Sequence, residues 1–295
     1  MTRIIESFDE ISARYRAAYV DLWGCLHNGY RPYAQAVAAL ARYRARGGKV
    51  ILLTNSPRPR PSVIRQLDKI GVPRDLYDDI AASGDASQFA LASGAVGYNV
   101  YHLGPERDLG FFRDLPEDVL QGHEIRRVPL EQAEGIVCTG LFDDDTETPE
   151  DYRATLLYAK NKGMKLLCTN PDQFVDKGDH RIYCAGAIAR AYEEMGGVSL
   201  YFGKPHPPIY DLARQRLDAI ADVEDSEIIC IGDGINTDIR GAMAEDLDSL
   251  FITGGLAAEE THTAPDEDAQ PDPARLKEFL DKAQLSPQFA MGHLR

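Results

Sequence analysis

The sequence has few cysteines, and they form no paired pattern. Five are scattered over 295 residues, an odd number without a CxxC pair: Cys25, Cys138, Cys168, Cys184 and Cys230. A disulfide-stabilised fold is therefore not expected, which fits a reducing compartment, and we expect a cytoplasmic protein. Thiols within apolar runs usually serve as small buried hydrophobic side chains.

Long apolar runs are also missing. No stretch reaches the roughly 18 apolar residues that a membrane-spanning helix needs. Residues 1–20 carry acids early and lack the compact apolar segment of a signal peptide. We therefore expect no membrane partner and no secretion signal.

Basic residues are outnumbered by acidic ones. Lys and Arg total 32 against 47 Asp and Glu, which gives a formal net charge of −15. Binding to nucleic acid or to an anionic membrane requires basic surface, so neither is an expected partner. A small phosphorylated metabolite stays compatible with this charge, because a metal ion and one lysine are enough to hold a phosphate locally.

Strand-like apolar runs alternate with helical patterns along the chain. The chain exceeds the usual size of one domain, about 100–200 residues, so a second domain or a large insertion is expected. Strands are predicted at 17–21, 49–54, 136–139, 164–169, 227–231 and 249–253. Helices are predicted at 33–46, 61–70, 149–162, 183–195, 207–219, 235–244 and 273–283. This alternation predicts an α/β fold with a parallel sheet.

Four polar clusters stand at or just after predicted strands, where open parallel sheets bind ligands. They are residues 21–24, 54–56, 203–205 and 232–238. Together they supply an acid, a hydroxyl with an amide, a lysine and two further acids. This set suits phosphoryl transfer, in which a carboxylate attacks phosphorus while Mg²⁺, a hydroxyl and a cation hold the phosphoryl oxygens.

Each cluster alone has an ordinary interpretation. An aspartate at a strand end often caps a turn, and Thr-Asn-Ser is a common helix N-cap. The Gly-Lys-Pro sequence suits a surface turn. Glycines that flank Asp233 are more specific, because they suggest a close approach of the backbone to a ligand. The order of all four clusters, each after its own strand, carries the inference.

This ordered set resembles the four signature motifs of the haloacid dehalogenase (HAD) superfamily. The insertion between the second and third motifs is similar to class IIA, the NagD-like branch of phosphatases. Local matches at 83–86, 169–172 and 203–210 extend the resemblance, which runs from about Val20 to Gly255. It implies a Rossmann-like core from residues 1–81 and 196–295, and an inserted α/β cap of the C2 type from residues 82–195. It also implies that a homodimer is compatible with the fold.

The resemblance implies a role for each motif residue. Asp21 is the expected nucleophile, forming an aspartyl-phosphate, and Lys204 neutralises the phosphoryl oxygens and orients it. Thr54 and Asn55 are expected to bind the phosphoryl group. The expected Mg²⁺ ligands are Asp21, the backbone of Trp23, Asp233 and Asp238. In the cap, Asn170 and Asp172 are expected to face the leaving group.

The first motif departs from the family at Trp23. The family usually has an acid here, which protonates the leaving oxygen and later activates water. Such general acid–base help contributes about 10²–10⁴-fold to a rate. A backbone carbonyl at this position still suits a metal, but an indole transfers no protons. The Asp-Leu-Trp-Gly sequence of residues 21–24 is similar to that of a subgroup of class IIA.

Three hypotheses follow from this departure. The first is a phosphatase in which another group replaces the lost acid, with His27 as the main candidate and His206 as a weaker one. An ordinary loop histidine, satisfied by backbone or solvent, is the alternative for His27. The second is transfer of another phosphorus group that needs less acid catalysis. The third is a regulatory protein that binds a phosphorylated ligand without turnover. The Asp21→Asn substitution separates enzymes from binders, because only enzymes need the carboxylate.

Two arginines near the second motif have a plain interpretation. Arg58 and Arg60 stand among three prolines. They are able to reach an anionic substrate, but a stiff exposed turn is the expected structure.

Overall fold

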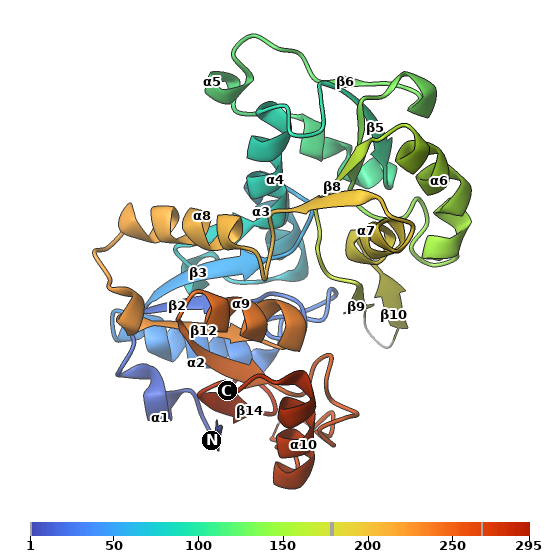
Figure 1. Ribbon diagram of the computed structural model, residues 1–295. Helices are drawn as coiled ribbons and strands as arrows, with labels where there is room; N and C mark the ends of the chain where they lie inside the picture. The colour runs from blue at the N-terminus through green and yellow to red at the C-terminus, as the bar shows by residue number, and fades with distance from the viewer. Residues whose placement is uncertain (1, 178–179, 267) are drawn as a thin grey trace.

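The chain builds two parallel sheets, as seen in a computed structural model that describes residues 2–177, 180–266 and 268–295 (Figure 1). Within those ranges the larger sheet has seven strands. Their order is β1 (Arg3–Ile4), β14 (Phe289–Met291), β13 (Asp248–Ile252), β12 (Ile228–Gly232), β2 (Ala17–Val20), β3 (Lys49–Thr54) and β4 (Asp79–Ala82). Segments from both halves of the chain, blue and orange to red in Figure 1, form this sheet. The predicted Rossmann-like core is confirmed.

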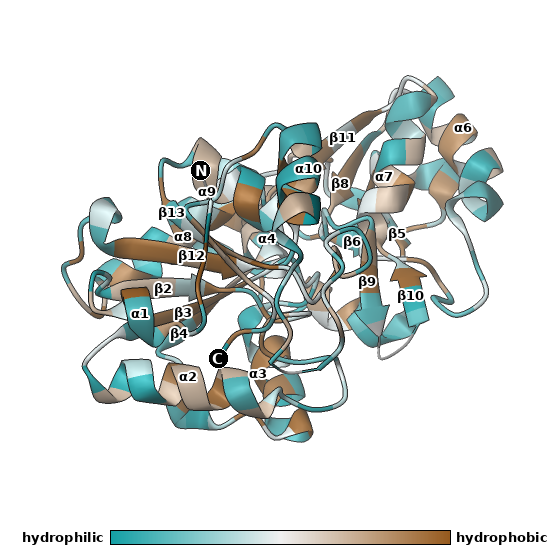
Figure 2. Ribbon diagram, turned by 90° about the horizontal axis from the view of Figure 1, so that it is seen from below, coloured by the Kyte–Doolittle hydropathy of each residue, from teal (hydrophilic) through white to brown (hydrophobic). Residues whose placement is uncertain are grey.

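Helices cover both faces of this core sheet. One face packs against α1 (Asp9–Ser12), α2 (Ala34–Ala45) and α3 (Arg60–Ile70). The other face packs against α8 (Pro207–Asp218), α9 (Arg240–Ala244) and α10 (Pro273–Ala283). Along β2 the side chains alternate between the faces, so that even this short strand is buried on both sides. Figure 2 shows the brown, hydrophobic core strands enclosed between helices that are partly teal.

The helix ends follow local sequence signals. In α2, Ala36, Ala39, Leu40 and Tyr43 are buried at the spacing of one helix face. Gly71 ends α3 in the left-handed conformation, with φ of 87°. The Asp272 side chain accepts hydrogen bonds from the first turn of α10, which begins at the predicted Pro273.

The smaller sheet is built from the middle of the chain, green to yellow in Figure 1. Its parallel strands lie in the order β11 (Val198–Tyr201), β8 (Lys165–Cys168), β7 (Gly135–Cys138), β5 (Asn99–Leu103) and β6 (Arg126–Arg127). One face packs against α6 (Arg153–Asn161) and α7 (Ala185–Glu194). The other face packs against α4 (Ser83–Ala92) and Phe111. We call this unit the cap.

Shorter elements complete the chain. An antiparallel hairpin pairs β9 (Phe174–Lys177) with β10 (His180–Tyr183), and α5 (Glu117–Leu120) is a single turn. The 3₁₀ turns are η1 (Arg74–Leu76), η2 (Glu106–Phe112), η3 (Leu130–Gln132), η4 (Pro149–Tyr152) and η5 (Asp225–Glu227). A π-helical turn, η6 (Ile235–Ile239), leads into α9. The helix predicted at 235–244 therefore begins as a wider turn, a feature often found at functional sites.

The division predicted at residues 195 and 196 is wrong at one strand. The prediction assigns residues 198–201 to the core, but β11 pairs with β8 in the cap sheet over its whole length. The physical reason is that α7 returns the chain beside β8, so that one more parallel strand forms before the chain crosses back. In the core sheet β1, β4 and β14 were not predicted, and β1 and β14 are too short to give a pattern. In the middle of the chain the unpredicted strands are β5, β6, β9, β10 and β11.

The sheet order brings three strand ends together. Strand β2 lies between β12 and β3, all three parallel, so Asp21, Thr54 and Asp233 emerge at one edge. The cap lies beyond this edge in Figure 1.

No helix within the described ranges has the length and apolar character needed to cross a membrane.

Candidate active site

A buried lysine joins the first and fourth motifs. Lys204 is 1% exposed, and its ammonium donates to Asp21 Oδ1 at 2.5 Å and to Asp238 Oδ1 at 2.6 Å. A third bond goes to the carbonyl of Leu53 at 2.9 Å, in the strand that leads to Thr54. All three donors of the ammonium are thus used, and Asp21 is fixed from a position far along the chain.

The side chain of Asn55 holds the backbone of this lysine. Its Oδ1 accepts from the Lys204 N–H at 2.7 Å, and its Nδ2 donates to the Lys204 carbonyl at 3.0 Å. The same Nδ2 also donates to Asp172 Oδ1 at 2.8 Å. Both ends of the side-chain amide are thus used within the protein, and this side chain positions Lys204. The predicted binding of the phosphoryl group at Asn55 is left to its backbone and stays a prediction.

The fourth motif supplies two acids with different surroundings. Asp238 accepts from Lys204 through Oδ1 and from the Gly234 N–H through Oδ2 at 3.0 Å. Asp233 follows β12 directly, and its Oδ2 accepts from the Leu256 N–H at 3.0 Å. The structure thus places Asp238 against Lys204 and leaves Asp233 facing Asp21.

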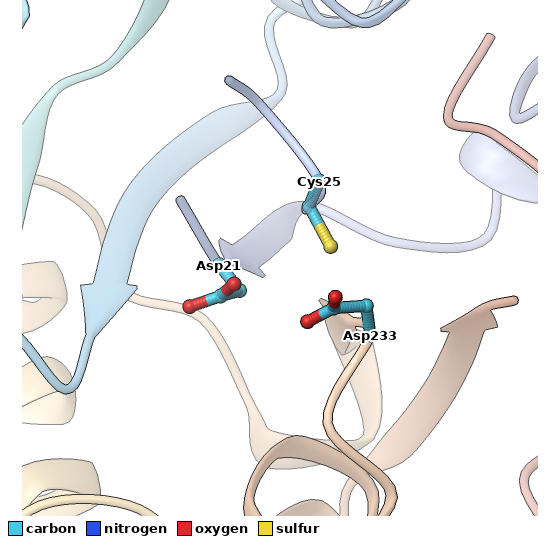
Figure 3. Close-up of side chains that lie close together, drawn as sticks. All are labelled: Asp21, Cys25 and Asp233. Carbon is cyan, nitrogen blue, oxygen red and sulfur yellow. The ribbon is translucent and has the colours of Figure 1, made fainter. Parts of the chain in front are cut away.

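Asp21, Asp233 and Cys25 each aim one atom at a common point (Figure 3). Their candidate ligand atoms lie within 4.8 Å of one another. Glycine makes this approach possible, since a Cβ would lie 2.1 Å from Asp233 Oδ2 at Gly24 and 1.9 Å from it at Gly255. Carboxylate oxygens are the donors that Mg²⁺ prefers, so Asp21 and Asp233 fit the predicted ion.

The charges at this point also favour a cation. Burial, together with Asp238, raises the pKa of Asp21 to about 7 although Lys204 lowers it. Burial and the neighbouring carboxylates of Asp21 and Asp238 raise the pKa of Asp233 well above its ordinary value. Burial alone would lower the pKa of Lys204, but these acids raise it. One ammonium faces three carboxylates, and a divalent cation beside Asp21 and Asp233 would balance them.

A cavity of about 780 Å³ opens above these groups. Its core side includes Asp21, Thr54, Lys204 and Asp233, and its cap side includes Asn170 and Asp172. Thr54 is 2% exposed, and its Oγ1 accepts from the Ser56 N–H at 3.2 Å, which leaves its hydroxyl hydrogen available to a ligand. The volume lies in the range of small-molecule sites.

The cap reaches the core through the loop that follows β8. Asn170 Oδ1 accepts from the Asp172 N–H at 3.0 Å, and Asp172 in turn accepts from Asn55. Burial raises the pKa of Asp172 to about 6, although Lys204 and the Asn55 hydrogen bond lower it. The two cap residues predicted to face the leaving group are therefore brought to the cavity.

Comparison with known proteins decides the family. Residues 18–115 match a model described as haloacid dehalogenase-like hydrolase, and residues 201–279 match a HAD-hydrolase-like model. A hydrolase of the haloacid dehalogenase-like family from Brucella suis 1330 is 39% identical, with a TM-score of 0.85 over 99% of this chain and 100% of that chain. The chain belongs to the HAD-like hydrolases. The family predicted from the motifs is confirmed.

A more distant relative and a protein of similar fold are phosphatases by name. An acid sugar phosphatase from Staphylococcus saprophyticus is 25% identical over 248 residues, which are 83% of this chain and 89% of the relative. A glycerol phosphate phosphatase from Mycobacterium tuberculosis, in complex with magnesium, is 22% identical with a TM-score of 0.65. That match covers 99% of this chain and 78% of the other, and it shows a shared fold.

Trp23 forms part of the cavity wall in this HAD-like hydrolase. Its indole lies on Gly29, where a Cβ would approach the ring to 2.5 Å. It also meets the His27 ring edge-on, with centroids 5.2 Å apart. The side chain therefore closes the cavity beside Asp21 and brings no ionisable group to it.

The structure contradicts His27 as a substitute acid or base. The ring is fully buried, and its Nδ1 accepts from the Gly29 N–H at 3.0 Å. Its Nε2 is also buried and has no hydrogen-bond partner among the described residues. Burial lowers the pKa of His27 to about 4, so the ring stays neutral. The ordinary alternative, a loop histidine satisfied by the backbone, holds for Nδ1 but not for Nε2.

Two features of the site escaped the sequence analysis. Cys25 faces Asp21 and Asp233, and its position four residues after Asp21 in the same loop was the available signal. Arg58 was expected on an exposed turn, but its Nε donates to the buried Asp108 of the cap at 2.9 Å and it lines the cavity. No local pattern predicts a partner fifty residues away.

Proposed function

We propose that this HAD-like hydrolase is a Mg²⁺-dependent phosphatase that cleaves a small phosphorylated metabolite through an aspartyl-phosphate at Asp21. One observation carries the proposal: Lys204 holds Asp21 against Asp238 while Asp21 and Asp233 converge under the cavity. A buried carboxylate fixed by a lysine at the floor of a cavity is arranged for attack on phosphorus.

Each residue of the site has a place in this reaction. The Asp21 carboxylate attacks phosphorus, and the Lys204 ammonium neutralises charge on the phosphoryl oxygens. The Thr54 hydroxyl donates to one of those oxygens, and Asn55 keeps Lys204 in position. Mg²⁺, held by Asp21, Asp233 and the Trp23 carbonyl, would supply charge neutralisation and orientation of the phosphoryl group.

Sugar and polyol phosphates are the proposed substrate class. Relatives of this chain include an acid sugar phosphatase and a glycerol phosphate phosphatase. A cavity of about 780 Å³ accommodates such a molecule between core and cap. Polar groups of Arg58 and Arg107 line the same cavity and suit an oxygen-rich leaving group.

The test is hydrolysis of p-nitrophenyl phosphate, glycerol phosphate and a panel of sugar phosphates, with and without Mg²⁺. We expect metal-dependent release of phosphate that falls to background in Asp21→Asn. Glu194→Gln, which removes an exposed carboxylate of α7 outside the cavity lining, should retain Mg²⁺-dependent release. Turnover that persists in Asp21→Asn would overturn the proposal.

Trp23 favours one second candidate, a protein that binds a phosphorylated ligand without turnover. The side chain at this position carries no transferable proton, although the rest of the site is complete. Titration calorimetry with inorganic phosphate separates the candidates. A binder should keep or increase its phosphate affinity in Asp21→Asn, because one negative charge is lost, and should release no phosphate from any substrate in the panel.

A further inference from the structure

The missing acid of the first motif leaves a defined chemical requirement. An alkoxide leaving group needs a proton, and the later attack of water on the aspartyl-phosphate needs a base. In-line displacement puts the leaving oxygen opposite the attacking carboxylate. Asp21 stands on the core side of the cavity, so the leaving oxygen must point toward the cap.

Asp172 is the carboxyl group that the cap brings to this place. It lies in the loop after β8, where a hydrogen bond joins the cap to the core. A Cβ on Gly203, next to Lys204, would lie 2.8 Å from the neighbouring Pro171 Cδ. Asp172 lines the cavity together with Asp21, and Asn55 Nδ2 holds its Oδ1 at 2.8 Å.

The other carboxylates that line the described cavity already have a cationic partner or face the metal position. Asp108 pairs with Arg58, Asp144 with Arg107 and Asp176 with Arg181. Asp21 and Asp238 share Lys204, and Asp233 faces Asp21. Arginine and lysine partners favour the ionised form and so oppose proton transfer.

The hydrogen bond of Asp172 comes from a neutral amide instead. Asn55 Nδ2 donates to Oδ1 whether the carboxyl group is ionised or protonated, so Oδ2 is the atom that carries the proton. Burial raises the pKa of Asp172 to about 6, while Lys204 lowers it and Asp238 raises it. Both protonation states are therefore accessible near neutral pH.

We propose that Asp172 of the cap supplies the general acid–base function that Trp23 cannot, an inference that rests on the proposed phosphatase activity. In the first step Asp21 attacks phosphorus, the phosphorus–oxygen bond to the leaving group breaks, and the Asp172 proton passes to the leaving oxygen to give an alcohol. In the second step the Asp172 carboxylate takes a proton from water as the water oxygen attacks phosphorus. The bond to Asp21 breaks, and inorganic phosphate is released.

The test variant is Asp172→Asn, which keeps an oxygen acceptor for Asn55 but carries no transferable proton. For glycerol phosphate we expect kcat/KM to fall by about 10²–10⁴-fold. For p-nitrophenyl phosphate kcat/KM should change little, since nitrophenolate leaves without a proton. Its kcat should fall, with a stoichiometric burst of nitrophenol, because the aspartyl-phosphate accumulates. Asp172→Glu should restore part of the glycerol phosphate rate.

Controls separate this inference from the proposed function. Glu194→Gln, which removes an exposed carboxylate outside the cavity lining, should keep the wild-type ratio between the two substrates. If Asp172 has a purely structural role, Asp172→Asn should lower kcat/KM equally for both substrates and give no burst. That result, or unchanged activity, would overturn this inference and leave the proposed function standing. Persistent turnover in Asp21→Asn, or no turnover in the wild type, would overturn both proposals.

Discussion

The ammonium of Lys204 lies buried between two carboxylates, and its removal would leave both without a counter-charge. We expect Lys204→Met to lower the free energy of unfolding by about 3–5 kcal/mol, as is typical when one partner of a buried ion pair is removed. Urea unfolding of the metal-free protein measures this loss.

The matched control is an exposed ion pair on α7. Arg190 Nε lies 3.0 Å from Glu194, with both side chains more than half exposed. Arg190→Met should cost no more than about 0.5 kcal/mol, because solvent screens the pair. Equal losses in the two variants would show that the buried carboxylates do not depend on Lys204.

His27 should couple stability to pH. Burial lowers its pKa from 6.5 to about 4, so between these values the unfolded chain binds a proton that the folded protein does not. Stability contributed by neutral His27 is therefore present above pH 6.5 and lost as the pH falls through 4. Asn at this position keeps an acceptor for the Gly29 N–H but does not titrate.

The measurement is the difference in unfolding free energy between wild type and His27→Asn, followed from pH 7 to pH 4. Relative to His27→Asn, the wild type should lose about 3 kcal/mol of unfolding free energy over this pH range. The comparison with a variant is needed because the raised pKa values of Asp21 and Asp172 act in the opposite direction on both proteins. A difference that stays constant with pH would contradict a buried, neutral His27.

At the scale of elements, sequence reasoning succeeded where a strand end fixes a residue. Asp21, Thr54 and Asp233 follow apolar runs whose period and length predict buried strands, and parallel pairing then brings them to one edge. It failed for side chains whose direction depends on packing. Asn55 turns to Lys204, 149 residues away, and His27 turns into its own loop. Neither orientation leaves a signal in the local pattern.

The loop after β13 offers a steric test of the metal position. A Cβ at Gly255 would lie 1.9 Å from Asp233 Oδ2, so Gly255→Ala must displace that carboxylate. We expect Mg²⁺ affinity, measured by calorimetry, to fall at least tenfold, in line with the 10–100-fold effects of disturbing the support of metal ligands. Gly110→Ala meets only Ser62 Oγ at 3.6 Å and should bind Mg²⁺ normally. Unchanged affinity in Gly255→Ala would exclude Asp233 as a ligand.

At the scale of the whole molecule, the two-part organisation was predictable and the junction was not. Length predicted a second domain or a large insertion, and the resemblance to class IIA implied that this insertion is a cap. The last cap strand, β11, escaped because residues 198–201 suit either sheet, and the choice depends on where α7 returns the chain. The contact of Arg58 with Asp108 likewise exists only once core and cap have come together.

Metal binding at Asp21 and Asp233 should stabilise the whole folded molecule. A ligand that binds only the folded state raises the free energy of unfolding by about 2.7 kcal/mol at 100 times its dissociation constant. We therefore expect Mg²⁺ to raise, and a chelator to lower, the melting temperature of the wild type. Asp233→Asn should lose this response, because Asp21 alone cannot hold the ion tightly.

The same variant should behave differently without metal. Asp233 and Asp21 are buried, and the Asp21 carboxylate raises the pKa of Asp233 by repulsion. Asp233→Asn removes one of three buried charges, so in chelator it should be at least as stable as the wild type. The order of the two melting temperatures should then reverse as Mg²⁺ is added. If Mg²⁺ raises the melting temperature of both proteins equally, the ion binds elsewhere. If Asp233→Asn is less stable than the wild type in chelator, Asp233 is stabilised by partners other than a cation.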